Sequence, residues 1–258
     1  MLRLSRLARA AACLAAVLLF PATEARAQGW RWTLTPYVWT TDVGMDVKLK
    51  DKSIVSETIA FTDLIEDLDA AMQIRIEGQN GAHGIFADLF FVGLSKEAQR
   101  FQLPNGTTGT IAPSMRMSIL DAAGTFNPRG NQQGFTLLYG TRIMVERVEI
   151  ETTFDAPPST SIPASQDTKD TLVDALIGAR YSRRLFSRWS VTAHADASAG
   201  ATEYTWSAGS DLAYNFGAAD RFAITAGYRR MDVQFKSELP IENRMTMSGF
   251  VGGFRMAF

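Results

Sequence analysis

The chain has 258 residues, of which 46% are hydrophobic and 21% are charged, with 26 Lys and Arg against 27 Asp and Glu. This balance provides no basic surface for nucleic acid, because binding to phosphates depends on an excess of Lys and Arg. A single cysteine, Cys13, excludes an internal disulfide and a thiolate metal site.

The first 27 residues have the pattern of a cleaved secretory signal peptide. Three arginines precede an apolar run over residues 10–20, and an A-x-A cleavage motif ends at Ala27. Almost no hydrophobic segment precedes Cys13, which argues against a lipoprotein signal. Removal of residues 1–27 takes away four basic residues and one acidic residue, so the mature domain 28–258 has a net charge of −4 and no cysteine.

No apolar run of helix-spanning length remains in the mature chain, so any membrane span must consist of strands. Residues 30–38 alternate between apolar and polar side chains and predict a first strand, with Pro36 near an edge, bulge or rim. Residues 42–56 predict a hairpin-like extension with Gly44 as a bend, and the region 42–59 forms either one long loop or a further strand pair.

A short helical segment is predicted near residues 61–69. Its apolar residues have i, i+3, i+4, i+7 spacing, and Asp63 with Glu66 could form a capping box. This segment either packs on the rim of the domain as a loop turn or forms a small plug in its mouth. The strand over 72–79 then turns at Asn80-Gly81, a strong hairpin signal, and returns over 85–94.

The middle of the chain predicts a loop at 103–110 and two longer strands over 115–126 and 135–150, joined by a polar turn at 127–134. The alternation changes phase near Arg147, which indicates a bulge or an exit from the membrane. The polar stretch 156–170 is predicted to be an extracellular loop.

The last third is the most regular part. Strands are predicted over 173–182, 189–198, 203–216 and 222–229, with another phase change at Arg230. Short turns at 184–188 and 217–220 alternate with a longer loop at 236–243. Tyr181, Trp189, Tyr214 and Phe216 lie at strand ends, where an aromatic girdle belongs.

The final residues, 248–258, place Phe250, Phe254, Met256 and Phe258 on one face and Arg255 on the other. This stretch resembles the closing strand of bacterial outer-membrane β-barrels, which typically ends in Phe and is read by the barrel-assembly machinery. The pattern predicts an all-β fold, a transmembrane antiparallel up-and-down barrel of about ten strands, with eight to twelve allowed. An even number places both termini in the periplasm.

Several short motifs add a family resemblance that extends from Trp30 to Phe258. Residues 35–39 (TPYVW), 84–88 (GIFAD), 173–181 (VDALIGARY) and 227–229 (GYR) are similar to a group of largely uncharacterised proteobacterial outer-membrane barrel proteins. The stretch 196–206 has fewer glycines than that group usually carries and lacks its Phe. The resemblance implies the fold and an outer-membrane location, and it implies no catalytic residues.

Charged residues of both signs fall on the predicted lumen face of the strands. A selective pore favours a ring of one sign, whereas interleaved signs predict ion pairs that cross a narrow lumen. The predicted lumen-lining set is Arg75, Glu77, Asp88, Arg142, Glu146, Asp174, Arg180, Asp196, Glu203, Asp211, Arg229 and Arg255.

Enzymatic and metal chemistry find little support. His194, Asp196 and Ser198 share one strand face, but neighbours at i and i+2 are about 6.6 Å apart along a strand, and a catalytic relay needs hydrogen bonds of about 2.6–3.2 Å. His83 follows a turn and is interpreted as solvated. The acidic residues of 63–69 have no recognised Ca²⁺-loop spacing.

These observations predict a non-enzymatic outer-membrane barrel without cofactor or metal, with a structural, adhesive or surface-interaction role. The alternatives are a narrow porin-like channel for small solutes or ions and, more distantly, a lipid-modifying enzyme. The expected partners are the lipid bilayer, lipopolysaccharide and the barrel-assembly machinery.

Overall fold

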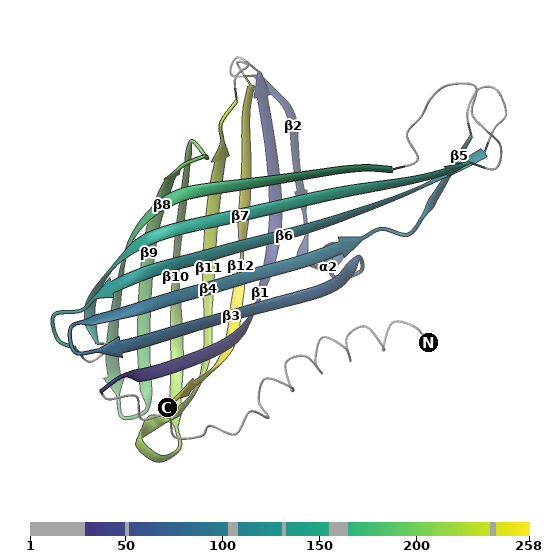
Figure 1. Cartoon of the computed structure of the whole chain (residues 1–258). Helices are drawn as coiled ribbons and strands as arrows, with labels where there is room; N and C mark the ends of the chain where they lie inside the picture. Colours follow the sequence, from purple (N-terminus) through teal and green to yellow (C-terminus); the bar gives the residue numbers. More distant parts are fainter. Residues whose placement is uncertain (1–28, 50–51, 103–107, 131–132, 155–164, 238–240) are drawn as a thin grey trace.

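A computed structural model describes residues 29–258 except 50–51, 103–107, 131–132, 155–164 and 238–240 (Figure 1). The predicted signal peptide at 1–27 lies outside the described residues. Among the described residues, no helix is long and apolar enough to cross a membrane.

Ten antiparallel strands form a closed barrel, as the alternation predicts. In ring order these are β1 (Arg31–Leu49), β3 (Leu68–Asn80), β4 (His83–Ser95), β6 (Thr108–Phe126), β7 (Gly134–Phe154), β8 (Ser165–Phe186), β9 (Trp189–Gly200), β10 (Tyr204–Phe216), β11 (Phe222–Phe235) and β12 (Ile241–Ala257). The pairing of β12 with β1 closes the ring.

Four of the connections between ring strands lie together at one end of the barrel, where β12 also ends (Figure 1). Gly81, with φ of 56°, forms the predicted tight turn between β3 and β4. The residues 127–133 join β6 to β7, and a two-residue turn at Ser187 and Arg188 joins β8 to β9. Residues 217–221, which include the short 3-10 helix η1 (Ala218–Asp220), join β10 to β11. We call this end the turn end.

Near the turn end the strands alternate as predicted, with large apolar side chains outside and polar side chains inside. Ile177 and Phe250 have 67% and 72% of their surface exposed, whereas Arg142 on the inner face is fully buried. The inner face accommodates these polar groups because they pair with one another. We call this part the closed half.

Beyond the closed half, the ring divides into two sheets at two seams. Pairing of β1 with β3 stops at Pro36 and Ile74, and pairing of β8 with β9 stops at Asp174 and Gly200. One sheet then consists of β10, β11, β12, β1 and β2 (Lys52–Ile59), and the other consists of β3, β4, β6, β7 and β8. These two sheets diverge in Figure 1, and we call this part the open half.

The open half has the reverse polarity, with apolar side chains inside and polar ones outside. Its core is a cluster of buried residues on the inner faces of both sheets: Tyr37, Trp39, Phe90, Met117, Ile119, Met144, Met231, Val233, Met245 and Met247. On the outer face, Arg147 pairs with Asp167 at 2.6 Å and with Glu149 at 2.9 Å. The strands therefore continue past the apolar outer belt of the closed half with the side-chain pattern of a water-soluble sandwich.

This reversal corrects the predicted phase changes at Arg147 and Arg230. The register of β6 with β7 and of β10 with β11 runs without a shift through both positions. The strands do not slip. Instead, the apolar face of each strand changes from the outer face in the closed half to the inner face in the open half. The alternation in the sequence therefore inverts without a change of register, and the bulge alternative at Arg147 is wrong.

Three predictions on the loops also need correction. Gly44 is not a bend, since β1 continues to Leu49 and pairs with β2 in a hairpin. Residues 165–170 belong to β8, while 155–164 lie outside the described residues. Residues 108–110 belong to β6, and β5 (Gln99–Gln102) pairs with β6, whereas 103–107 lie outside the described residues.

The predicted helical segment is short and lies on the rim. Helix α2 (Phe61–Leu64) has Ala60 as its N-cap and no side-chain cap, so the Asp63–Glu66 capping box is wrong. The Phe61 backbone N–H instead donates to Asp42 Oδ1 at 2.8 Å, on the outer face of β1. The helix contains no buried residue. It is therefore not a plug in the barrel mouth.

Candidate functional site: the ion-pair network of the lumen

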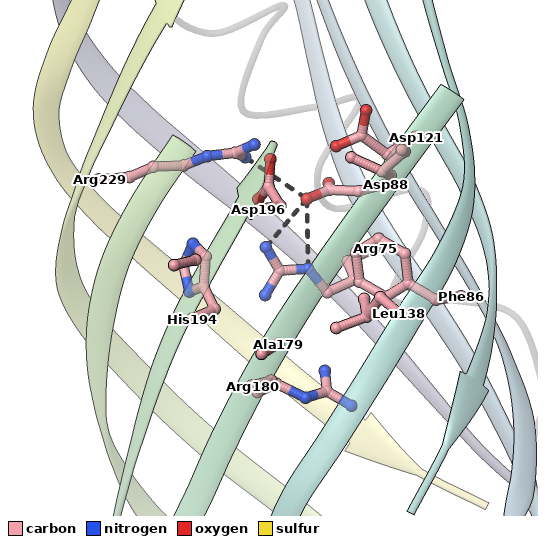
Figure 2. Close-up of a pocket in the computed structure, with 12 residues that line it drawn as sticks. Arg75, Phe86, Asp88, Asp121, Leu138, Ala179, Arg180, His194, Asp196 and Arg229 are labelled. Atoms are coloured by element: carbon pink, nitrogen blue, oxygen red, sulfur yellow. Dashed lines mark hydrogen bonds and ion pairs between the residues drawn. The ribbon is translucent and has the colours of Figure 1, made fainter. Parts of the chain in front are cut away.

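The charged residues of the closed half point inward because each occupies the face of its strand opposite the exposed apolar residues. Asp88 on β4 is the centre of one group. It accepts from Arg75 on β3 at 2.9 Å, from Arg229 on β11 at 3.5 Å, and from the Tyr37 hydroxyl on β1 at 2.7 Å. Figure 2 shows Arg75 and Arg229 reaching Asp88 from two sides. This carboxylate links distant parts of the wall.

Arg142 on β7 is the centre of the second group. Its guanidinium donates to both oxygens of Asp121 on β6, at 2.7 Å each, and to Asp196 Oδ1 on β9 at 2.8 Å. The Arg142 side chain is fully buried. A bidentate, charge-assisted geometry of this kind is what offsets the cost of removing an ion pair from water.

A third pair crosses the lumen near the turn end. Arg180 Nη1 on β8 donates to Glu77 Oε1 on β3 at 2.7 Å, across the ring from its own neighbours. Arg255 on β12 donates to the side-chain oxygen of Asn215 on β10. The network thus connects opposite walls of the closed half.

Aromatic rings complete the network where it meets the apolar cluster. The Arg229 guanidinium lies over the Trp39 ring, with 4.9 Å from Cζ to the ring centroid. Arg75 lies over Tyr37 and Phe86 at 5.7 and 5.6 Å. Cation–π contacts are stronger when they are desolvated, so the charged layer and the apolar layer stabilise each other.

A small cavity in the lumen lies among these residues. It offers about 30 Å³ to the centre of a water molecule, and one water needs roughly 10–15 Å³ on this measure. Arg180 Nε and His194 Nε2 are buried in the cavity lining without a hydrogen-bond partner among the described residues. One or two waters in this space would satisfy them.

Most of the predicted lumen set lies in this network, but four members do not join it: Glu146, Asp174, Glu203 and Asp211. Asp211 faces the lumen without a salt bridge among the described residues. Glu146 lies on the inner face of the open half, opposite Asp170 in the register of β7 and β8. Glu203 is exposed in the turn before β10, so its placement in the lumen is wrong.

Asp174 is buried, but its partners are not arginines. Its carboxylate accepts from the hydroxyl groups of Ser198 and Thr202 and from the Thr202 backbone N–H at 3.0 Å. These contacts fix the turn between β9 and β10, where the seam begins. Asp174 is therefore a positioning residue for the edge of the closed half.

Sequence reasoning missed Asp121, Tyr37 and Trp39 as parts of the network. Asp121 is the lone charge within residues 117–126, the same signal that singled out Asp88 on β4. Tyr37 falls on the predicted lumen face, but its hydrogen bond to Asp88 depends on the barrel register.

The His194, Asp196 and Ser198 side chains make separate contacts. Asp196 accepts from Arg142, and the Ser198 hydroxyl donates to Asp174 at 3.2 Å. In the described part of the chain, no group of three or more His, Cys, Asp and Glu side chains is placed to hold a metal ion. His83 is exposed at the turn end, beside the Phe126 ring at 5.3 Å.

Comparison with protein-family models gives no match, and comparison with curated protein sequences gives no significant match. Among solved structures, the chain is similar to Ail, the attachment invasion locus protein of Yersinia pestis, in complex with a heparin analogue. The TM-score is 0.32 at 11% identity, over 88% of this chain and 99% of Ail.

A FadL homologue of Pseudomonas aeruginosa gives a TM-score of 0.32 at 8% identity, over 90% of each chain. The transport unit of the autotransporter AIDA-I from Escherichia coli gives 0.31 at 10% identity, over 95% of this chain and 96% of that one. These similar structures are outer-membrane β-barrels. Similarity at this level does not assign a function to this chain.

Proposed function

We propose that the protein is an integral outer-membrane barrel with a closed lumen, which acts through the surfaces that its open half presents outside the membrane. The outer face of the closed half supports the membrane location. It exposes large apolar side chains on eight of the ten ring strands and at the C-terminal residue: Val38, Met72, Ile76, Ile85, Phe135, Leu137, Tyr139, Val173, Ile177, Tyr181, Leu212, Ile224, Tyr228, Phe250 and Phe258. Such a continuous apolar belt fits lipid and not water.

An aromatic girdle borders this belt at the turn end. Six aromatic rings follow one another, and the centroids of successive rings are 5.2–6.4 Å apart: Phe186, Trp189, Tyr214, Phe216, Phe222 and Phe254. Aromatic side chains prefer the level of the lipid headgroups. The short turns beside them correspond to the periplasmic side of such barrels.

The ion-pair network is the observation that carries the proposed closed lumen. Three ion pairs join strands that are not neighbours in the ring: Asp88 with Arg229, Arg142 with Asp196, and Glu77 with Arg180. To pass an ion, the lumen would have to separate buried pairs, and each separation leaves a buried charge without its partner. This arrangement favours a structural or adhesive role over the channel alternative.

The open half supplies the surface for that role. Its two sheets hold their apolar faces inward and carry charged residues outward, including Arg116, Arg147, Glu149 and Asp167. Strands β6, β7 and β8 reach well past the belt (Figure 1). A rigid, charged sheet surface beyond the lipid is suited to contact with polymers or other cells.

Single-channel recording of the refolded protein in planar bilayers tests the closed lumen. The expected result is no stable conductance step for the wild type. The variant Arg75→Ala/Asp88→Ala/Arg229→Ala, which removes the central group and leaves the Arg142 group intact, should show steps. Steady wild-type conductance would favour the narrow-channel alternative.

A further inference from the structure

The turn end of the barrel carries a concentration of exposed arginines. Six of them lie in its turns and adjacent strand ends: Arg31, Arg129, Arg183, Arg184, Arg188 and Arg221. The acidic side chain in the same described turns is Asp220, which pairs with Arg184. Five of the six guanidinium groups therefore have no carboxylate partner among the described turn residues.

Three of these arginines adjoin the aromatic girdle. Arg183 lies on the outward face of β8, between the exposed Tyr181 and Leu185. Arg188 precedes Trp189 in the chain, and its Nη1 donates to the hydroxyl of Tyr214 at 3.2 Å. Arg221 directly precedes Phe222 and is exposed. Each guanidinium thus lies at the boundary between the apolar belt and water.

The opposite end has a different charge. Helix α2 and the residues that follow it up to the start of β3 carry Asp63, Glu66, Asp67 and Asp69. Arginines of the open half, such as Arg147 and Arg244, are paired with carboxylates. An excess of free positive charge is therefore a property of the turn end and not of the whole surface, since the mature chain as a whole is acidic.

We infer that Arg183, Arg188 and Arg221 form a binding surface for anionic phospholipid headgroups at the turn end. The inference rests on the proposed insertion in a membrane and adds the lipid class and the leaflet. A guanidinium presents several N–H donors in a fork that matches phosphate oxygens. Its aliphatic stem lies along the apolar belt while its charged head reaches the headgroups.

The charge excess selects the headgroup class. Each basic residue close to an anionic lipid surface contributes about 1 kcal/mol, or about a fivefold gain in binding. Zwitterionic headgroups have no net charge and would gain little from the same residues. The leaflet at the turn end should therefore be enriched in anionic phospholipid around this barrel.

Thermal unfolding of the barrel, followed by heat-modifiable migration on gels, tests this inference. The protein is refolded into vesicles of phosphatidylcholine and into vesicles of equal parts phosphatidylcholine and phosphatidylglycerol. A ligand that binds the folded state raises its midpoint, so the midpoint of the wild type should be higher in the mixed vesicles. In Arg183→Gln/Arg188→Gln/Arg221→Gln this difference should disappear.

A matched variant removes three arginines from the opposite end, namely Arg100→Gln/Arg116→Gln/Arg147→Gln, and it should keep the wild-type difference. Inorganic phosphate added to the phosphatidylcholine vesicles should not reproduce the increase, because a free anion lacks the fixed position of a headgroup. An increase with phosphate alone would reassign the surface to soluble phosphates.

Equal wild-type midpoints in the two vesicles would overturn the inference, and so would a triple turn-end variant that keeps the difference. Failure of the proposed membrane barrel gives a separate result, because it would prevent stable insertion in the neutral vesicles as well. Heat-modifiable migration in phosphatidylcholine alone therefore serves as the control for folding.

Discussion

The closed half and the open half of this barrel use the same strands with opposite polarity. In the closed half, β7 points Arg142 inward and Ile143 outward, and in the open half it points Met144 inward and Arg147 outward. The backbone register does not change between them. What differs is the surroundings of the outer face, which is lipid in our proposal for one half and water for the other.

This difference shows that the interior of a barrel is determined by what surrounds it. Where the outside is apolar, the small interior is filled by charged residues that satisfy one another. Where the outside is aqueous, the interior becomes an ordinary apolar core with methionines that fill irregular space. A substitution should therefore have opposite consequences in the two halves, which makes the comparison testable.

The largest expected effect comes from Arg142→Met on the inner face of the closed half. It leaves Asp121 and Asp196 buried without their partner, and a lost member of a buried pair costs about 3–5 kcal/mol. Urea unfolding of the barrel in vesicles measures this change. Arg147→Met, on the outer face of the same strand, should change stability little, because that pair is exposed. Similar losses for both would contradict the two-half description.

The apolar cluster provides a second test. Met247 on β12 is fully buried in the open half, so Met247→Ala should cost about 2–5 kcal/mol in free energy of unfolding, as other buried methionine truncations do. Met72→Ala is the control, because Met72 lies half-exposed on the outer face of β3. If Met247→Ala were harmless, the open half would not be held together by its core.

The outer face distinguishes the halves by their tolerance of charge. Ile177 and Thr171 both point outward from β8, six residues apart. Ile177→Arg should destabilise the inserted protein by about 2–4 kcal/mol if the site is near the bilayer midplane. Thr171→Arg should be tolerated, since it faces water in the proposed arrangement. The urea midpoint of each variant in vesicles decides between the two outcomes.

The smallest perturbation concerns orientation alone. Residues 28–258 contain no cysteine, so Arg116→Cys in the open half and Ser187→Cys at the turn end each introduce one exposed thiol into this part of the chain. On intact cells, a membrane-impermeant maleimide should label the first and not the second. The reverse pattern would place the turn end outside the cell and invert the proposed topology.

The closed half was largely predictable from the sequence because lipid outside and charge inside produce strict alternation, as in 72–79 and 222–229. In the open half, the slip at Arg230 and the bulge alternative at Arg147 were wrong, because an inversion of polarity within a continuous strand gives the same sequence pattern as a slip of register. Local alternation cannot separate these two cases. Only pairing with the neighbouring strand does so. The other alternative at Arg147, an exit from the membrane, stays a prediction.

The site was predictable as a set of residues but not as a set of contacts. Alternation placed Asp88 and Arg229 in the lumen, yet their pairing depends on strand tilt and on the distance across the ring, which no local pattern contains. Asp121 was overlooked although it stands alone among apolar neighbours, as Asp88 does. Glu203 has the right phase for the lumen but belongs to a turn, where phase has no meaning.

The pairing of Asp88 with Arg229 also has a consequence for how the barrel assembles. These residues are 141 positions apart, and they meet only when the late strands of the chain return to the early ones. Until then, the Asp88 and Arg229 charges can retain a hydration shell larger than the one or two waters for which the finished cavity has space. We therefore expect ring closure, loss of most of the interior water and neutralisation of these charges to occur together as one late, slow step.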